Sequence, residues 1–325
     1  MLSNLFTELL MRISLDHVLL MLIALTVVLI PSIFTITHSS EEDNLRMAVE
    51  FNDHSAAAWV AIDKGIFEEL GLNVTYLETF RTGLELSAAM MRGDVDVAWA
   101  CLGPVIMAYS NGLPIKVVAG THLQGYAIVA RSEFEEPSQL DGGVLACPGK
   151  GSPCYLLLKL FVERHGLSYT LMYLRPDLAV NALITGQIDA AALPEHYVTL
   201  AVRRGECRVL AQSQDLWPNM PGSVLVVRED LIEEKPELVS KLVQATIKAT
   251  CLIEDDFEGS ASVVASRLGL TLDEALESMS HLEYDVKVDL AEYQKYIDLM
   301  AQYGCIPQSF NASNLVDLSF LGESS

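Results

Sequence analysis

The chain has few basic residues: 21 Lys and Arg stand against 43 Asp and Glu, which gives a formal net charge of −22. A protein this acidic repels polyanions, and this argues against nucleic-acid binding. The charge does not argue against a small anionic ligand, because a local pocket can oppose the overall field. Its ordinary effect is solubility. With 325 residues, 51% of them hydrophobic, the chain can build two sizeable cores.

Signatures of metal sites and of enzymes are missing. The six cysteines include no C-x-x-C pair, so neither a zinc site nor a dense disulfide framework is indicated. Cys147 and Cys154 flank one turn, and two interpretations remain open: a disulfide in an oxidising compartment, or two small buried residues. No Walker loop, nucleophile elbow, His-Glu metal motif or kinase signature is present. The sequence therefore predicts no cofactor and no enzymatic activity.

One long apolar run lies near the N-terminus. Val18–Thr37 contains no charged residue, and roughly 20 apolar residues span the hydrocarbon core of a bilayer. A cleaved signal peptide would have a shorter apolar region and a small-residue cleavage site, and a buried core helix would be shorter and less uniform. We therefore predict a transmembrane anchor at residues 17–37. Residues 1–16 would lie inside, and the soluble domain would lie on the extracytoplasmic side of the cell membrane.

After Asn44, strand and helix signals alternate, which implies parallel sheets with right-handed crossovers. Strands are expected at Met47–Phe51, Val74–Leu77, Val95–Ala100, Ile115–Ala119, Tyr126–Arg131 and Ser223–Arg228. Helices are expected at Ala56–Leu70, Leu84–Arg92, Gly103–Ser110, Pro236–Cys251, Leu272–His281 and Leu290–Tyr303.

Part of this pattern occurs twice. Met90–Ala98 and Leu183–Ala191 each contain a helix end, a glycine, an Asp three residues later and a small-residue strand. Each copy alone is a common helix–strand junction, but two copies in the same order indicate two lobes of like fold.

Breaker-rich stretches at Ser132–Gly143 and Trp217–Gly222 are the expected crossings between the lobes. We therefore predict an α/β fold of two Rossmann-like lobes joined by a two-stranded hinge and preceded by the transmembrane helix. Lobe 1 would comprise residues 45–131 and 223–310, lobe 2 residues 132–222, and an irregular tail residues 311–325. The cleft between lobes is the expected binding site.

Several motifs resemble a known family. They are Ala61–Phe67, Met91–Ala98, Pro148–Pro153 followed by Tyr155–Leu157, Thr185–Ala190 and Pro194-Glu195. In this order and spacing the chain resembles periplasmic binding proteins of the nitrate/sulfonate/taurine/bicarbonate type, including binders of thiamine pyrimidine precursors. The resemblance covers roughly residues 46–255. It implies a type II periplasmic binding protein fold, ligand capture between the lobes, and delivery to an ABC permease driven by an ATPase.

In open α/β lobes, ligands meet the loops at the carboxyl ends of strands. This rule and the resemblance select the candidate ligand-binding residues. In lobe 1 they are Asn52, Asp53, His54, Arg81, Thr82, Leu102, Gly103 and His122, and in lobe 2 they are Lys150, Gly151, Ser152, Glu195 and His196.

Three of these candidates suggest a chemistry. Ser152 can cap a helix with Pro153 in its first turn, where free N–H groups attract an anion, and the resemblance implies ligand contact there. Arg81 can pair with a carboxylate or sulfonate, or it is an ordinary exposed arginine. Glu195 favours an amine, hydroxyl or ring nitrogen, or it is an ordinary helix N-terminal acid.

His54, His122 and His196 all fall on expected cleft loops. Together they could bind a transition metal or a bicarbonate-like anion, but no spacing motif joins them, so three separate polar residues is the favoured interpretation and no metal site is predicted.

The predicted function is a membrane-anchored substrate-binding protein of an ABC importer for a small polar or anionic solute. An enzyme on the same fold and a membrane-tethered ligand sensor are the alternatives.

Overall fold

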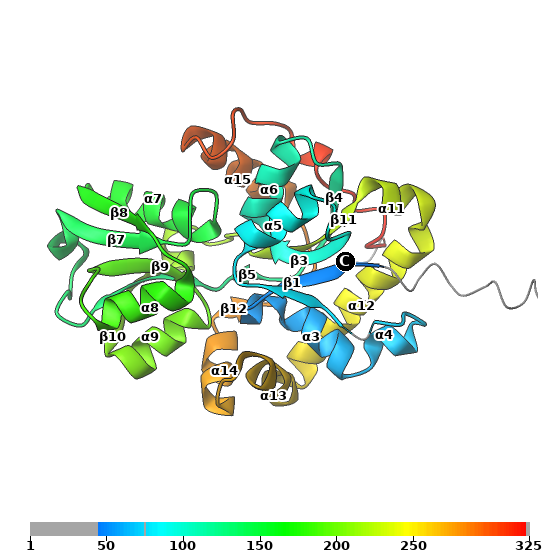
Figure 1. Cartoon of the computed structure of the whole chain (residues 1–325), viewed down its shortest axis with the longest axis horizontal. Helices are drawn as coiled ribbons and strands as arrows, with labels where there is room; N and C mark the ends of the chain where they lie inside the picture. Colours follow the sequence, from blue (N-terminus) through cyan, green and yellow to red (C-terminus); the bar gives the residue numbers. More distant parts are fainter. Residues whose placement is uncertain (1–44, 75, 323–325) are drawn as a thin grey trace, which may run out of the picture. The chain divides into compact units, whose positions relative to one another are not determined.

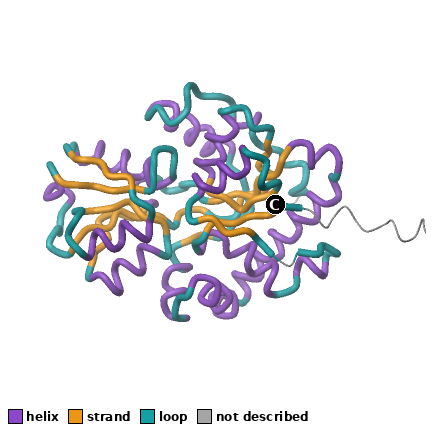
Figure 2. The backbone as a smooth tube through the Cα atoms, viewed as in Figure 1, coloured by secondary structure: helices purple, strands orange, loops and turns teal. Residues whose placement is uncertain are grey.

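The computed structural model describes residues 45–74 and 76–322, which form one compact unit with two five-stranded sheets. Figure 2 shows the two sheets as separate orange groups flanked by helices. In the sheet of lobe 1 the order is β2 (Glu78–Phe80), β1 (Met47–Glu50), β3 (Val97–Cys101), β11 (Ser223–Arg228) and β4 (Ile115–Gly120). In the sheet of lobe 2 it is β8 (Tyr169–Tyr173), β7 (Gly143–Cys147), β9 (Ala190–Pro194), β6 (Tyr126–Arg131) and β10 (Cys207–Gln212).

The two sheets match position by position. The first three strands of each order are parallel, and the fourth runs antiparallel to its neighbours. The prediction of two lobes of like α/β fold is confirmed.

The repeated aspartate has the same role in both lobes. The Asp96 N–H donates to the Arg46 carbonyl (2.8 Å), and its carboxylate accepts from the Arg46 N–H (3.1 Å) and guanidinium (2.7 Å). The Asp189 N–H donates to the Val144 carbonyl (2.8 Å), and its carboxylate accepts from the Val144 N–H (2.8 Å) and the Arg131 guanidinium (3.0 Å). The motif recurs because an Asp at this junction ties the start of one strand to its parallel neighbour.

The first predicted crossing between the lobes is wrong. Tyr126–Arg131 is not in the sheet of lobe 1, because its buried residues need a partner on each side and find them in β9 and β10. The chain crosses just before it, at Gln124–Gly125. The Gln124 N–H donates to the Met220 carbonyl (3.0 Å) and the Gly222 N–H to the His122 carbonyl (3.1 Å), so the outgoing and returning passages lie side by side.

Helices cover both faces of each sheet (Figure 1). In lobe 1 they are α3 (Ala56–Asp63), α4 (Ile66–Glu69), α5 (Gly83–Met91), α6 (Leu102–Ser110), α11 (Glu229–Glu234), α12 (Pro236–Asp255), α13 (Phe257–Leu268), α14 (Leu272–Met279) and α15 (Leu290–Gln302). In lobe 2 they are α7 (Pro153–His165), α8 (Pro176–Ile184), α9 (Tyr197–Gly205) and α10 (Ser213–Leu216). Short 3₁₀ turns are η2 (Asp53–Ser55), η3 (Pro137–Leu140) and η4 (Ala312–Asn314), and β5 (Leu123–Gln124) pairs with β12 (Leu282–Glu283) at the hinge.

Alternate residues of β3 face two cores. Val97 and Trp99 pack in the core shared with α3 and α12, and Ala98 and Ala100 pack in the core shared with α5 and α6. Such burial on both faces explains why the central strands are almost entirely apolar.

Three further expectations need correction. The predicted helix Ala56–Leu70 is two helices, because Gly65 takes a left-handed conformation (φ 72°) that ends the first. The predicted strand Val74–Leu77 lies too early, since Glu78–Phe80 pairs with β1. The tail is not irregular throughout: Leu315 is fully buried, and its carbonyl accepts from the Val117 N–H (2.9 Å).

Within residues 45–74 and 76–322, no helix is long and apolar enough to cross a membrane. The predicted anchor at 17–37 lies outside the described residues.

Candidate functional site

A cavity lies between the two lobes. Lobe 1 contributes Glu50, Asn52, Arg81, Thr82, Gly83, Leu84, Cys101 and Pro104, and lobe 2 contributes Tyr126, Pro148, Ser152, Pro153, Cys154, Pro176, Pro194 and Tyr197. Most of these residues end or follow a parallel strand, as expected for a ligand site in an open α/β sheet.

The N-termini of helices from both lobes open onto this cavity. In lobe 1, Thr82 caps α5, its hydroxyl accepting from the Glu85 N–H (3.2 Å). In lobe 2, the Ser152 hydroxyl accepts from the Tyr155 N–H (3.1 Å) and donates to the Gly149 carbonyl (2.8 Å). The positive ends of two helix dipoles therefore lie beside one space.

Glu50, which was not predicted, is the most buried acid of this cavity, with 3% of its surface exposed. Its Oε1 accepts from the Cys101 N–H (2.6 Å), and its Oε2 from the Cys101 thiol (3.2 Å) and the Asn52 amide (3.4 Å). Burial raises the pKa of the Glu50 carboxyl, and these hydrogen bonds oppose that rise. Among the described residues no cationic side chain pairs with it.

Two polar side chains complete the lobe 1 wall. Asn52 is buried, and its Oδ1 has no hydrogen-bond partner. Arg81 is exposed, and its guanidinium lies 4.4 Å from the centre of the Phe51 ring, a cation–π contact.

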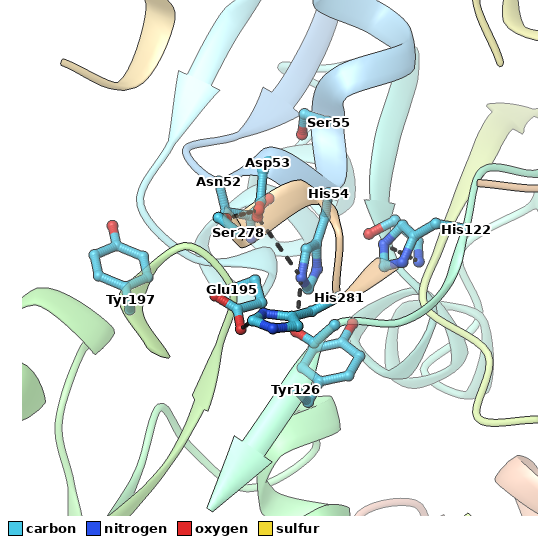
Figure 3. Close-up of polar contacts among 12 residues, drawn as sticks. Asn52, Asp53, His54, Ser55, His122, Tyr126, Glu195, Tyr197, Ser278 and His281 are labelled. Atoms are coloured by element: carbon cyan, nitrogen blue, oxygen red, sulfur yellow. Dashed lines mark hydrogen bonds and ion pairs between the residues drawn. The ribbon is translucent and has the colours of Figure 1, made fainter. Parts of the chain in front are cut away.

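A second group of polar residues lies at the hinge, and we call Asp53, His54, His122, Glu195, Ser278 and His281 the histidine cluster (Figure 3). His281 Nδ1 donates to Glu195 Oε1 (2.8 Å), while Glu195 Oε2 accepts from the Thr199 N–H (3.2 Å) and hydroxyl (2.9 Å). The Ser278 hydroxyl donates to the Asp53 carboxyl. The Ser278–Asp53 contact joins α14 to η2 within lobe 1. The His281–Glu195 contact joins the end of α14 to the start of α9 in lobe 2.

The two histidines of the cluster that were predicted as ligand contacts bond to the hinge backbone. His54 Nε2 donates to the Gly125 carbonyl (3.0 Å), and His122 Nε2 accepts from the Ser223 N–H (3.0 Å). Burial lowers the pKa of His54 well below its usual value and that of His122 to about 4, so both rings are neutral at pH 7. Burial, with Glu195 nearby, raises the pKa of Asp53 to about 8.

The predicted residues therefore separate into three groups. Those that line the cavity are Asn52, Arg81, Thr82 and Ser152. Those placed in the histidine cluster are Asp53, His54, His122 and Glu195. Those in neither place are Leu102, Gly103, Lys150, Gly151 and His196.

Backbone contact between the lobes explains part of the third group. A Cβ atom on Gly103 would lie 2.4 Å from the Gly151 carbonyl oxygen, so these glycines allow the lobes to touch. Lys150 is exposed, with Nζ near Gly304. His196 packs beside Tyr197, with ring centres 4.1 Å apart.

The three histidines do not converge on a metal site. The rings of His54 and His122 are tilted at 56° with centres 4.4 Å apart, but no group of three His, Cys, Asp or Glu side chains in the described parts of the chain is arranged to hold a metal ion. Cys147 and Cys154 are free, buried thiols. Of the two interpretations of that pair, the structure shows the one without a disulfide.

Sequence comparison then gives the family. The model of the NMT1-like family matches residues 38–269. The chain belongs to this family. A relative in Bacillus subtilis, a putative aliphatic sulfonates-binding protein, is 23% identical over 277 residues, which are 81% of this chain and 82% of that protein. The nitrate import ATP-binding protein NrtC of Synechococcus elongatus is 27% identical over 244 residues, but these cover only 36% of that longer protein.

Solved structures agree on the fold. The alkanesulfonate-binding protein SsuA from Xanthomonas axonopodis pv. citri, bound to MOPS, superposes with a TM-score of 0.76 at 21% identity, covering 85% of this chain and 98% of that one. The resemblance to nitrate/sulfonate/taurine binding proteins is confirmed. The aliphatic sulfonates-binding relative and the SsuA structure are solute-binding proteins rather than enzymes, in agreement with the prediction.

Proposed function

We propose that the chain is the substrate-binding component of an ABC importer, which captures a small polar or anionic solute between its lobes and delivers it to a permease. One observation carries this proposal: a cavity lined by strand ends of both lobes, onto which the capped N-termini of α5 and α7 open. A solute held there contacts both lobes at once.

The hinge supplies the mechanism. In the described residues the chain passes between the two sheets in two adjacent passages, near Gln124 and Gly222, so a rotation there would separate the walls of the cavity. A solute that binds both walls favours the closed arrangement, because it contacts more of the protein in that state. The closed arrangement is the form that the permease recognises.

The apolar run Val18–Thr37 supports a tether in this proposal. It would keep the receptor at the outer surface of the membrane beside its permease and ATPase. If the tether exists, the full chain stays in the membrane fraction after alkaline carbonate washing, while a chain that starts at Leu45 is released.

Ligand-dependent stabilisation of the full chain in detergent tests the function. Taurine, ethanesulfonate, nitrate and bicarbonate are added separately, and the melting temperature is measured. A ligand at roughly 100 times its Kd stabilises the native state by about 2.7 kcal/mol. Arg81→Ala should reduce the response, whereas Arg92→Ala, at an exposed position on the far end of α5, should not. No response to any of these solutes would argue against the proposed function.

A further inference from the structure

Glu50 and Asn52 form a wall of hydrogen-bond acceptors in the cavity. Glu50 is almost fully buried, and every group that touches its carboxyl is a donor: the Cys101 N–H, the Cys101 thiol and the Asn52 amide. Burial raises the pKa of this carboxyl, and surroundings that only donate oppose that rise because they favour the ionised form.

The Glu50 carboxyl has no counter-ion among the described residues. The buried acid Glu274 pairs with Arg204 (2.6 Å) and the buried acid Glu195 with His281 (2.8 Å). Within residues 45–74 and 76–322, no basic side chain pairs with Glu50 in this way. Buried charges are normally paired, so a cation from outside the protein would offset the cost of burial and favour the ionised Glu50 carboxylate.

Asn52 independently indicates the same kind of partner. Its side chain is 5% exposed and lines the cavity, and its Nδ2 is turned toward Glu50. The Oδ1 is therefore the acceptor, and it has no partner. A buried acceptor without a donor costs roughly 1–3 kcal/mol, so a donor on the solute would be favourable beside it.

The other parts of the cavity have the opposite polarity. Ser152 marks the N-terminus of the 13-residue helix α7, and Arg81 brings a cation to the lobe 1 edge. An anionic group suits this side. A simple oxyanion, which has no hydrogen-bond donor, is attracted by the α7 N-terminus and Arg81 but repelled by the ionised Glu50 carboxylate.

Resting on the proposed function, we propose that Glu50 and Asn52 recognise an ammonium or amino nitrogen on the captured solute. The substrate class is then a small zwitterion, such as an aminosulfonate or an ω-amino acid, with its anionic end toward α7 and Arg81. Glu50 would be the residue that separates such solutes from simple oxyanions.

Matched pairs of compounds test this assignment on the full chain in detergent by titration calorimetry. Taurine is compared with ethanesulfonate, and β-alanine with propionate. In the better-bound pair the amino compound should bind at least about ten-fold more tightly, because it gains charge-assisted hydrogen bonds. Glu50→Gln should reduce this ratio to less than about three-fold, largely through weaker binding of the amino compound.

Two further variants keep the test decisive. Glu68→Gln, at an exposed position on α4, should leave the ratio unchanged. Asn52→Ala removes the free acceptor but not Glu50, and should lower the ratio by about three-fold, so it replaces Glu50→Gln if that variant fails to fold.

The results separate the two proposals. Equal or tighter binding of the amine-free compounds or of nitrate would overturn the assignment to Glu50 while leaving solute capture intact. A preference that survives in Glu50→Gln would also overturn it. If no compound in the panel binds, the proposed function itself fails.

Discussion

Glu195 in the histidine cluster and Glu50 in the cavity are both buried acids, 2% and 3% exposed, yet their surroundings differ. Glu195 has a basic partner in His281, a contact that joins the lobes, and two donors from Thr199. Glu50 has only neutral donors and faces a space between the lobes. A buried acid with its partner inside the protein serves structure, and one whose partner is missing is the stronger candidate for ligand binding.

The largest stability effect is expected at Glu195. Glu195→Ala should lower the free energy of unfolding by about 2–3 kcal/mol, because the Thr199 N–H and hydroxyl and the His281 ring lose their acceptor. Urea denaturation of the full chain measures this. Glu195→Gln keeps an acceptor and should lose less. A change within experimental error for the alanine variant would contradict a structural role.

The second largest stability effect is expected at His281, the partner of Glu195. His281→Gln should cost about 1 kcal/mol near pH 5.5. The hydrogen bond to Glu195 raises the pKa of His281 above its usual 6.5. A raised pKa means that its contribution is fully present below pH 6.5 and is lost as the pH rises through the folded-state pKa. The difference between wild type and variant should therefore shrink by pH 9.

Glu50→Gln should not destabilise the protein at neutral pH. Burial raises the pKa of the Glu50 carboxyl above its usual 4.5, so between pH 4.5 and the folded-state pKa the folded protein holds a proton that the unfolded chain releases. Stability of the wild type therefore falls as the pH rises from 4.5 through the folded-state pKa, and the neutral amide avoids that loss. We therefore expect the stability difference to move in favour of the variant as the pH rises from 4.5 to 8. A clear loss at pH 8 would show that Glu50 is structural, like Glu195.

The smallest effect is expected where the lobes meet at their surface. Arg203 of α9 pairs with Glu277 of α14, and the two side chains are 39% and 34% exposed. Arg203→Gln should cost about 0.5 kcal/mol at low salt and nearly nothing at roughly 1 M salt. A larger, salt-independent loss would mean that this pair belongs with the buried contacts of the histidine cluster.

Local patterns predicted much of the fold. The repeated Asp96 and Asp189 indicated matching lobes because each satisfies strand ends within its own lobe. The Ser152 cap followed from its neighbours in sequence. The predicted boundary between lobe 1 and lobe 2 was wrong at Tyr126–Arg131, because the sequence of an apolar strand does not show which of two sheets it joins.

The site was harder to predict, because its contacts link distant parts of the chain. The Asp53 carboxyl accepts a hydrogen bond from the Ser278 hydroxyl, 225 residues away in the sequence, and the residues near Asp53 give no sign of this partner. The rule that ligands meet the carboxyl ends of strands therefore selected both hinge residues and cavity residues, because it does not distinguish between them. Glu50 was passed over as the interior of a strand that in fact ends there. A single acid in an otherwise apolar four-residue strand was the available signal.

The position of β11 has a consequence for synthesis on the ribosome. This strand lies between β3 and β4, so the sheet of lobe 1 stays divided until Arg228 has been made. The sheet of lobe 2 is complete at Gln212. Lobe 2 is an insertion that can fold while the lobe around it is still open, and a nascent chain halted after Gln212 should expose the unpaired edges of β3 and β4 to chaperones.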